Sequence, residues 1–215
     1  MVCPHCLKEG LFDFWMSINV DSDPELRKKI FSDDMFTYKC PHCGYVTRVP
    51  FSFSYHDKKH HFMLFYDLIR SDDYDYEPLG IPEEAFKKND YRIIREVYGI
   101  NQLREKILIL EKGLNDVAIE RQKYMITHFI IPDLAKNGTE FFFHHTEEPT
   151  DEFPYGTIFF VYYDEKEEKV VKVHFAMDDY YEHCKSCDMD PRMEVRGVTC
   201  VDEGWISKQL KEEEP

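Results

Sequence analysis

The first 66 residues carry apolar side chains in the short period that is typical of β-strands. Residues 49–55 alternate between apolar and polar positions, and such alternation sends the two kinds of side chain to opposite faces of a strand. Runs rich in apolar and β-branched residues predict strands at 11–20, 36–40, 45–55 and 61–66. The front of the chain is therefore expected to be rich in β-structure.

One short helix interrupts these strands. Asp23 and Pro24 suit the cap and the first turn of a helix on which Leu26 and Ile30 share a face. Further along, residues 82–84 predict the start of another short helix, and residues 92–98 are extended.

The middle of the chain follows a helical period. Residues 101–112 predict a helix with Leu103, Ile107 and Leu110 at helical spacing, and Asn101 is expected to cap it. Residues 116–132 predict a second helix. A glycine separates the two, so we expect a helical hairpin.

The last segment of the chain returns to strands. They are predicted at 139–145, 157–163, 170–177 and 194–201, with a closing helix at 204–210. The turn residues at 136–138 indicate a domain boundary. We therefore expect an α+β fold with a domain at 1–135, made of a β-rich segment at 1–66 and a helical segment at 83–132, followed by a small α+β unit at 139–215.

Charge is unevenly distributed and argues against nucleic acid as the default partner. Residues 1–66 hold 8 basic and 8 acidic side chains, so residues 67–215 hold 27 − 8 = 19 basic and 42 − 8 = 34 acidic groups, the whole net charge of −15. An acidic surface repels phosphate backbones. The neutral front segment could still contact a single strand locally, which leaves nucleic-acid binding as an alternative.

Composition and the start of the chain indicate a cytoplasmic globular protein. Hydrophobic residues make up 43% of the chain, which is enough for packed cores. No apolar run reaches the roughly 18 residues of a membrane helix, and no secretory leader pattern is present. We therefore expect no membrane contact and a cytoplasmic location, where thiols stay reduced.

The tetrapeptide CPHC occurs twice, at 3–6 and 40–43, and it fits two chemistries. A thioredoxin-type disulfide exchange site needs a helix that begins at the first cysteine, because the helix N-terminus lowers the thiol pKa. Only two residues precede Cys3, and Cys43 is followed by Gly44 and strand-forming residues. Neither copy has the setting that disulfide exchange requires.

Two Cys-x-x-Cys turns instead predict one closed zinc site. The ligands are Cys3, Cys6, Cys40 and Cys43. Four thiolates complete a tetrahedral shell with no open position, which is typical of structural zinc. Binding of the metal would then contribute folding energy to the front segment. Gly44 supplies the positive φ that is favoured after the second cysteine of such a turn.

The third cysteine pair has fewer companions. Cys184 and Cys187 could be joined by Cys200, and a fourth zinc ligand would have to be His183 or His174. His183 is adjacent to Cys184, which makes binding of one metal by both awkward. We therefore expect a reduced pair in a loop and no second metal site.

The front half resembles a known family. VCPHC, SINVDSDPELRKKI, YKCPHCGYVTRVPFSFSYHD and the helical NQLREKILILEKGLNDVAIE are similar to the bacterial CpXC family, named for two Cys-Pro-x-Cys motifs. The resemblance covers roughly residues 1–130. It implies four metal-binding cysteines at 3, 6, 40 and 43, and no established molecular activity. The two Cys-x-x-Cys turns themselves make the predicted β-rich segment at 1–66 zinc-ribbon-like. Leu7 stands where a glycine is expected.

Other constellations are weaker. His56 and Asp57 could form an acid–base pair, but a polar turn between two strands is the better explanation of these residues. Our first hypothesis is a zinc-binding protein whose structural metal supports a module that binds another protein. The alternatives are an enzyme that uses His56 and Asp57, and a binder of single-stranded nucleic acid. The sequence specifies neither the partner nor the oligomeric state.

Overall fold

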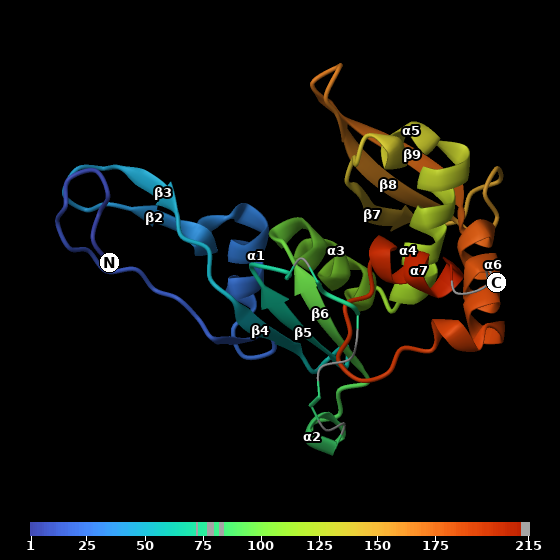
Figure 1. Cartoon of the computed structure of the whole chain (residues 1–215), viewed down its shortest axis with the longest axis horizontal. Coiled ribbons are helices and arrows are strands. Elements are labelled where there is room, and N and C mark those ends of the chain that lie inside the picture. Colours follow the sequence, from blue (N-terminus) through green and yellow to red (C-terminus); the bar gives the residue numbers. More distant parts are fainter. Residues whose placement is uncertain (72, 77–79, 82–83, 212–215) are drawn as a thin grey trace. The chain divides into compact units, whose positions relative to one another are not determined.

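The structure is a computed structural model that describes residues 1–71, 73–76, 80–81 and 84–211. It has a mixed α+β fold, as predicted, with three sheets among the described residues. Contacts divide the chain into two compact units (Figure 1): a first unit of Met1–Tyr74 with Pro82–Gly99, and a second of Asp75–Ile81 with Ile100–Pro215. The boundaries proposed from the sequence, 1–135 and 139–215, stay a prediction.

The first unit is organised by a sheet of four strands. In spatial order these are β1 (Ser17–Asn19), β4 (Phe53–Asp57), β5 (Phe62–Asp67) and β6 (Ile93–Tyr98). β1 runs parallel to β4 and β5 runs parallel to β6, whereas β4 and β5 are antiparallel. The predicted strands at 61–66 and 92–98 are therefore present.

The two faces of this sheet differ because side chains alternate along each strand. One face is fully buried and carries Ile18, Tyr55, Phe62, Leu64 and Val97. The opposite face, which we call the polar face, carries Ser17, Asn19, Ser54, His56, Met63 and Phe65. The apolar face forms the core of the first unit, and its burial stabilises the fold. The polar face is available for binding.

A two-stranded ribbon of β2 (Thr37–Lys39) and β3 (Val46–Arg48) lies in the sequence between β1 and β4 of that sheet. Between β1 and β2, α1 (Pro24–Ser32) buries Leu26 and Ile30, as the sequence predicts. Asp23 occupies the cap position, but its side chain makes no capping hydrogen bond. The predicted strand at 11–20 forms only at β1. α2 spans Glu84–Lys87, and its predicted start at 82–83 lies outside the described residues.

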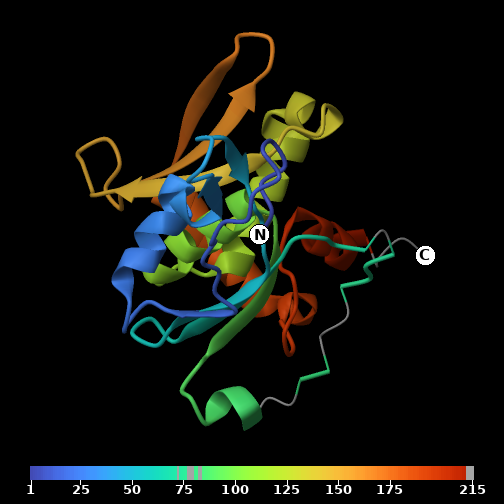
Figure 2. The same ribbon diagram turned by 90° about the vertical axis from the view of Figure 1, so that its left-hand side faces the viewer.

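The second unit contains an antiparallel sheet of β7 (Phe141–Glu147), β8 (Thr157–Asp164) and β9 (Lys169–Ala176). β8 and β9 form a twisted hairpin, drawn in orange in Figure 2. The helices of this unit are α3 (Ile100–Glu111), α4 (Asp116–Met125), α5 (Pro132–Lys136), α6 (Met177–Met189) and α7 (Glu203–Lys211). A π-helical turn at Ile126–Ile130 connects α4 to the segment before α5.

Three sequence predictions for the second unit are wrong. The sequence predicts no helix at residues 178–189, yet they form most of α6. The strand predicted at 194–201 is reduced to β-bridge residues at Val198 and Thr199, and Gly197 before them, with a φ of 60°, breaks the extended path. Asn101 lies inside α3 rather than at its cap, whereas Asn115 caps α4 by accepting hydrogen bonds from the N–H groups of Val117 and Ala118.

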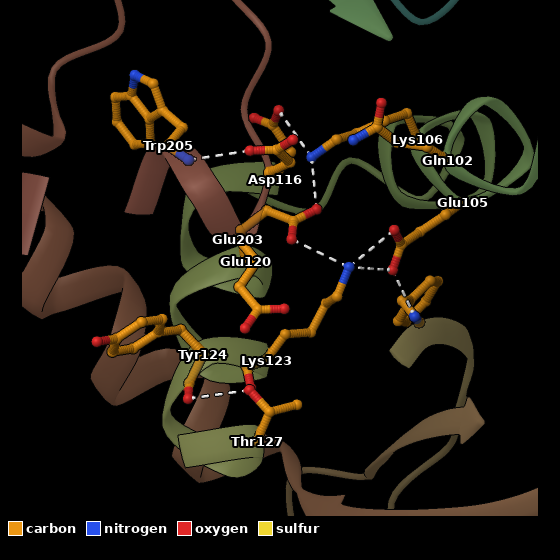
Figure 3. Close-up of polar contacts among 12 residues, drawn as sticks. Gln102, Glu105, Lys106, Asp116, Glu120, Lys123, Tyr124, Thr127, Glu203 and Trp205 are labelled. Carbon is orange, nitrogen blue, oxygen red and sulfur yellow. Dashed lines mark hydrogen bonds and ion pairs between the residues drawn. The ribbon is translucent and has the colours of Figure 1, made fainter. Parts of the chain in front are cut away.

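A buried network of charged side chains holds α3, α4 and β7 together (Figure 3). Lys123 pairs with Glu105 at 2.9 Å and with Glu120 at 3.0 Å. Lys106 lies 2.8 Å from Glu120 and 3.6 Å from Asp116. Glu105 also accepts a 2.6 Å hydrogen bond from the backbone N–H at the centre of β7. Burial raises the pKa of Glu105, and the ammonium of Lys123 opposes that rise.

Within the described residues of the chain, no helix is both long enough and apolar enough to cross a membrane.

Candidate metal centre

The four cysteines of the two CPHC motifs converge at the tip of the first unit. Their sulfur atoms all lie within 4.8 Å of one another. Cys3 Sγ is 3.8 Å from Cys43 Sγ, and Cys6 Sγ is 3.7 Å from Cys40 Sγ. Sulfurs at about 2.3 Å from a central zinc in a tetrahedron are about 3.8 Å apart, whereas a disulfide requires about 2.05 Å. The geometry is compatible with a metal site and excludes disulfides between these pairs.

Both motifs sit on equivalent turns, although they are far apart in the sequence. In each copy the residue before the first cysteine pairs with the third residue after the second cysteine. Val2 bridges to Glu9 in the first copy, and Lys39 pairs with Val46 in the second. The two CPHC segments are therefore the tips of two matching hairpins.

The two turns are closed by the same hydrogen bond. The N–H of Leu7 donates to the carbonyl of Cys3, and the N–H of Gly44 donates to the carbonyl of Cys40, each at 2.9 Å. Leu7 has a φ of 59° and Gly44 a φ of 73°. The absence of glycine at position 7 has not changed the turn, because the leucine adopts the left-handed conformation that glycine favours.

The two hairpins also pack on each other. The ring of His5 stacks on Tyr45 with centroids 5.4 Å apart, and His42 Nε2 hydrogen-bonds the carbonyl oxygen of Glu9 at 3.0 Å. The histidine inside each CPHC motif thus contacts the opposite hairpin. These contacts orient the two pairs of thiols toward one another.

Tyr38 lies beneath the centre as a member of a small buried cluster. It packs with Cys3 and Cys40, and Phe12 and Val49 cover the edge of the cluster. Gly10 makes room for it: a Cβ at that position would lie 2.1 Å from the Tyr38 hydroxyl. Burial, followed by the nearby Cys40 sulfur, raises the pKa of Tyr38 to about 12. The phenol therefore stays protonated beside the thiols.

The surroundings shift the pKa values of Cys40 and Cys43 in opposite directions. Burial works against ionisation of Cys40, but backbone N–H groups of His42 and Cys43 lower its pKa to about 6. Cys43 receives one N–H from Tyr45, yet burial and the sulfurs around it raise its pKa to about 12. An ionised Cys40 opposes ionisation of Cys43, and a divalent cation would remove that repulsion, because cysteines bind metal as thiolates.

The remaining cysteines lie in the second unit. Cys184 and Cys187 are one turn apart on α6 rather than in the predicted loop. Burial raises the pKa of both thiols, that of Cys187 to about 11. Cys200 is buried near the side chains of Gln102 and Asp202. Among the described residues, the CPHC cysteines are the one group with ligand atoms gathered for a metal.

The candidate acid–base pair is divided between the two faces of the sheet. His56 lies on the polar face, where its ring nitrogens hydrogen-bond Ser54 Oγ and the Tyr91 hydroxyl, each at 2.9 Å. Asp57 lies on the buried face and accepts a 2.7 Å hydrogen bond from His60. The carboxylate therefore orients His60, and His56 has hydroxyl partners instead.

Sequence reasoning missed the residues that support the centre. Tyr38 and Gly10 carry no motif, and their roles depend on the fold bringing residues 10 and 38 together. The sequence likewise gives no indication that His5 stacks on Tyr45. The one available signal was the repetition of CPHC itself, since identical turn sequences predict matching hairpins.

The fold and the centre define a mixed α+β protein with a four-cysteine, metal-type centre in an N-terminal ribbon. The family model described as CpXC protein matches residues 1–123, more than half of the 215-residue chain. The chain therefore belongs to the CpXC family. No curated protein and no solved structure matches it.

Proposed function

We propose that this is a zinc-binding protein in which the zinc is structural and supports a protein-interaction module. The observation that carries the proposal is the convergence of four sulfurs, with edges of 3.7 and 3.8 Å, at the tip of the first unit. Four thiolates in a tetrahedron favour zinc among common metals and leave no position for a substrate. Reduced thiols suit a cytoplasmic location.

Metal content per chain tests the zinc proposal. Elemental analysis of the purified protein is expected to give one zinc per chain, and Cys40→Ser with Cys43→Ser should remove it. The matched control is Cys184→Ser with Cys187→Ser, which changes two thiols on α6 and should retain the zinc. Full zinc content in the first double variant would overturn the assignment, and a value near two in the wild type would indicate a second site.

An exposed apolar segment next to the centre supports the interaction role in the proposal. Within residues 11–16, Leu11 is 96% exposed, Phe14 63% and Met16 79%. Clustered exposed apolar side chains mark protein-binding surfaces. Phe12, in the same segment, packs against the buried cluster beneath the cysteines. The metal thus holds the segment in place through Phe12. The exposed apolar side chains of the segment can then bind an apolar surface on a partner protein.

Capture of a partner protein by the wild type and by variants tests whether residues 11–16 form the docking surface. The variant Leu11→Ser, Phe14→Ser and Met16→Ser should lose a partner that the wild type retains. The control, Phe129→Ser with Ile130→Ser, removes apolar side chains that are 68% and 59% exposed in the second unit, and it should retain that partner. The captured protein is then purified and its affinity measured directly. Equal binding by the triple variant would show that residues 11–16 are not the docking surface.

A further inference from the structure

We propose that the polar face of the four-stranded sheet contains a binding site for a small organic anion, with an oxyanion head and an apolar body. The site is a pocket of about 370 Å³ that lies entirely within the first unit. It goes beyond the proposed function, since it uses neither the cysteines nor the exposed segment at 11–16.

The floor of the pocket is a row of side chains across three strands. Asn19 on β1 lies beside His56 on β4, which lies beside Met63 on β5. Ser17 extends the floor by one step along β1. Their chain neighbours point into the buried core, so strand alternation fixes this row on the polar face.

The opposite wall comes from α2 and the segment after it. Phe86, Asn89 and Tyr91 line the pocket, and Phe86 packs edge-on against Phe65 of the sheet at 6.3 Å between centroids. Phe86 and Tyr91 are each 8% exposed. An apolar body would therefore rest between Phe86 and Met63.

The polar groups of the pocket favour an acceptor-rich ligand. Lys58 lines the rim and brings a positive charge, and none of the described lining residues is acidic. Asn19 Oδ1 already accepts a hydrogen bond from the backbone N–H of Asp21 at 3.1 Å, so its amide nitrogen, a donor, is the end that remains for a ligand. Ammonium and amide donors together suit a carboxylate or phosphate oxygen.

His56 is built into the pocket as a fixed, neutral ring. Ser54 Oγ and the Tyr91 hydroxyl occupy its two nitrogens at 2.9 Å each, so the ring cannot rotate freely. Burial and the charge of Lys58 lower its pKa. A bound anion would offset the charge of Lys58 beside the ring and so oppose this lowering of the His56 pKa. The geometry is that of a preorganised site rather than an accidental gap.

A nuclear magnetic resonance titration of the full-length, zinc-loaded protein tests the site. Benzoate serves as the probe, and benzamide is its neutral counterpart with the same ring. Benzoate is expected to shift the His56 ring signals, and benzamide should bind much more weakly. Lys58→Met should weaken benzoate about tenfold, since one charge-assisted hydrogen bond contributes roughly that much. Lys59→Met changes a neighbouring exposed lysine that does not line the pocket and should have no effect.

A second variant tests the contribution of Tyr91, in the wall of the pocket, to anion binding. Tyr91→Phe keeps the ring and removes the hydroxyl that holds His56, so benzoate affinity should fall while zinc content stays at one. Three outcomes would overturn the proposal: benzoate shifts no His56 signal, benzamide binds equally well, or Lys58→Met binds like Lys59→Met. Because zinc content is measured on the same samples, failure of this site is distinguishable from failure of the metal assignment.

Discussion

Leu7 takes a backbone conformation that residues with a Cβ rarely adopt. Its φ is 59°, close to the 73° of Gly44 at the equivalent place in the other turn. The left-handed region costs an L-residue about 1–2 kcal/mol. The side chain is 77% exposed, so little packing offsets this cost. The turn is retained because its hydrogen bond and the two thiols require it.

Leu7→Gly should therefore stabilise the metal-bound first unit. Relief of the left-handed strain outweighs the extra freedom of glycine in the unfolded chain, for a net gain of about 0.5–1 kcal/mol. Gly44→Ala should cost about 1 kcal/mol by the same reasoning. Urea unfolding of the zinc-loaded protein measures both. Leu11→Gly, an exposed residue outside the left-handed region, is the control, and a gain there would contradict the explanation.

The residues of the centre show what sequence could and could not predict at this scale. The sequence predicts the cysteines at 3, 6, 40 and 43 as metal ligands, because paired Cys-x-x-Cys motifs are a common zinc-binding pattern. In the structure their sulfurs lie close together. The role of Tyr38 was invisible, because it depends on a three-dimensional contact with Gly10 and Cys40. The polar-face pocket was also missed, since α2 and β1 contribute to it from distant segments of the chain.

At the scale of elements, α6 shows how a helix can be overlooked. Its buried residues Met177, Tyr180 and Cys187 are spaced by three and seven positions, which is a helical period. The residues just before α6 are aromatic and β-branched, so the sequence predicts a strand that continues to Met177. The strands before it were predicted well, because β7, β8 and β9 are rich in aromatic and β-branched residues, which favour strands.

The buried ionic network is the second feature at this scale, and it supports a strong prediction. Lys123 lies between Glu105 and Glu120 and pairs with both carboxylates. Lys123→Met would leave both carboxylates buried without that ammonium, and breaking a buried pair costs about 3–5 kcal/mol. Urea unfolding should show this loss in the second unit. Lys112→Met replaces an exposed lysine just after α3 and should change little; similar losses in both variants would contradict a role for the network.

The whole molecule consists of two units with separate sources of stability. The first unit combines an apolar sheet face with a metal-type centre at its tip. The second has its own sheet, helices and buried ionic network, and in the described residues no group of metal-ligand atoms. Metal and folding free energy should therefore be linked in the first unit only.

Two tryptophans allow that separation to be measured. Trp15 belongs to the first unit and packs on Phe51 with centroids 6.5 Å apart, whereas Trp205 is buried in the second unit. Because the chain has just 2 tryptophans, Trp205→Phe and Trp15→Phe each leave a single fluorescent reporter. Removal of zinc with a chelator should shift the emission of Trp15 toward that of an exposed indole and leave Trp205 unchanged.

Urea unfolding, followed by each tryptophan reporter, provides a second measurement of the same prediction. In urea, the Trp15 transition should move to lower denaturant after chelation, and the Trp205 transition should stay in place. Returning zinc should restore the first transition, which separates metal loss from irreversible damage. If both reporters shift together on chelation, the metal stabilises the whole chain, and the two units do not unfold independently.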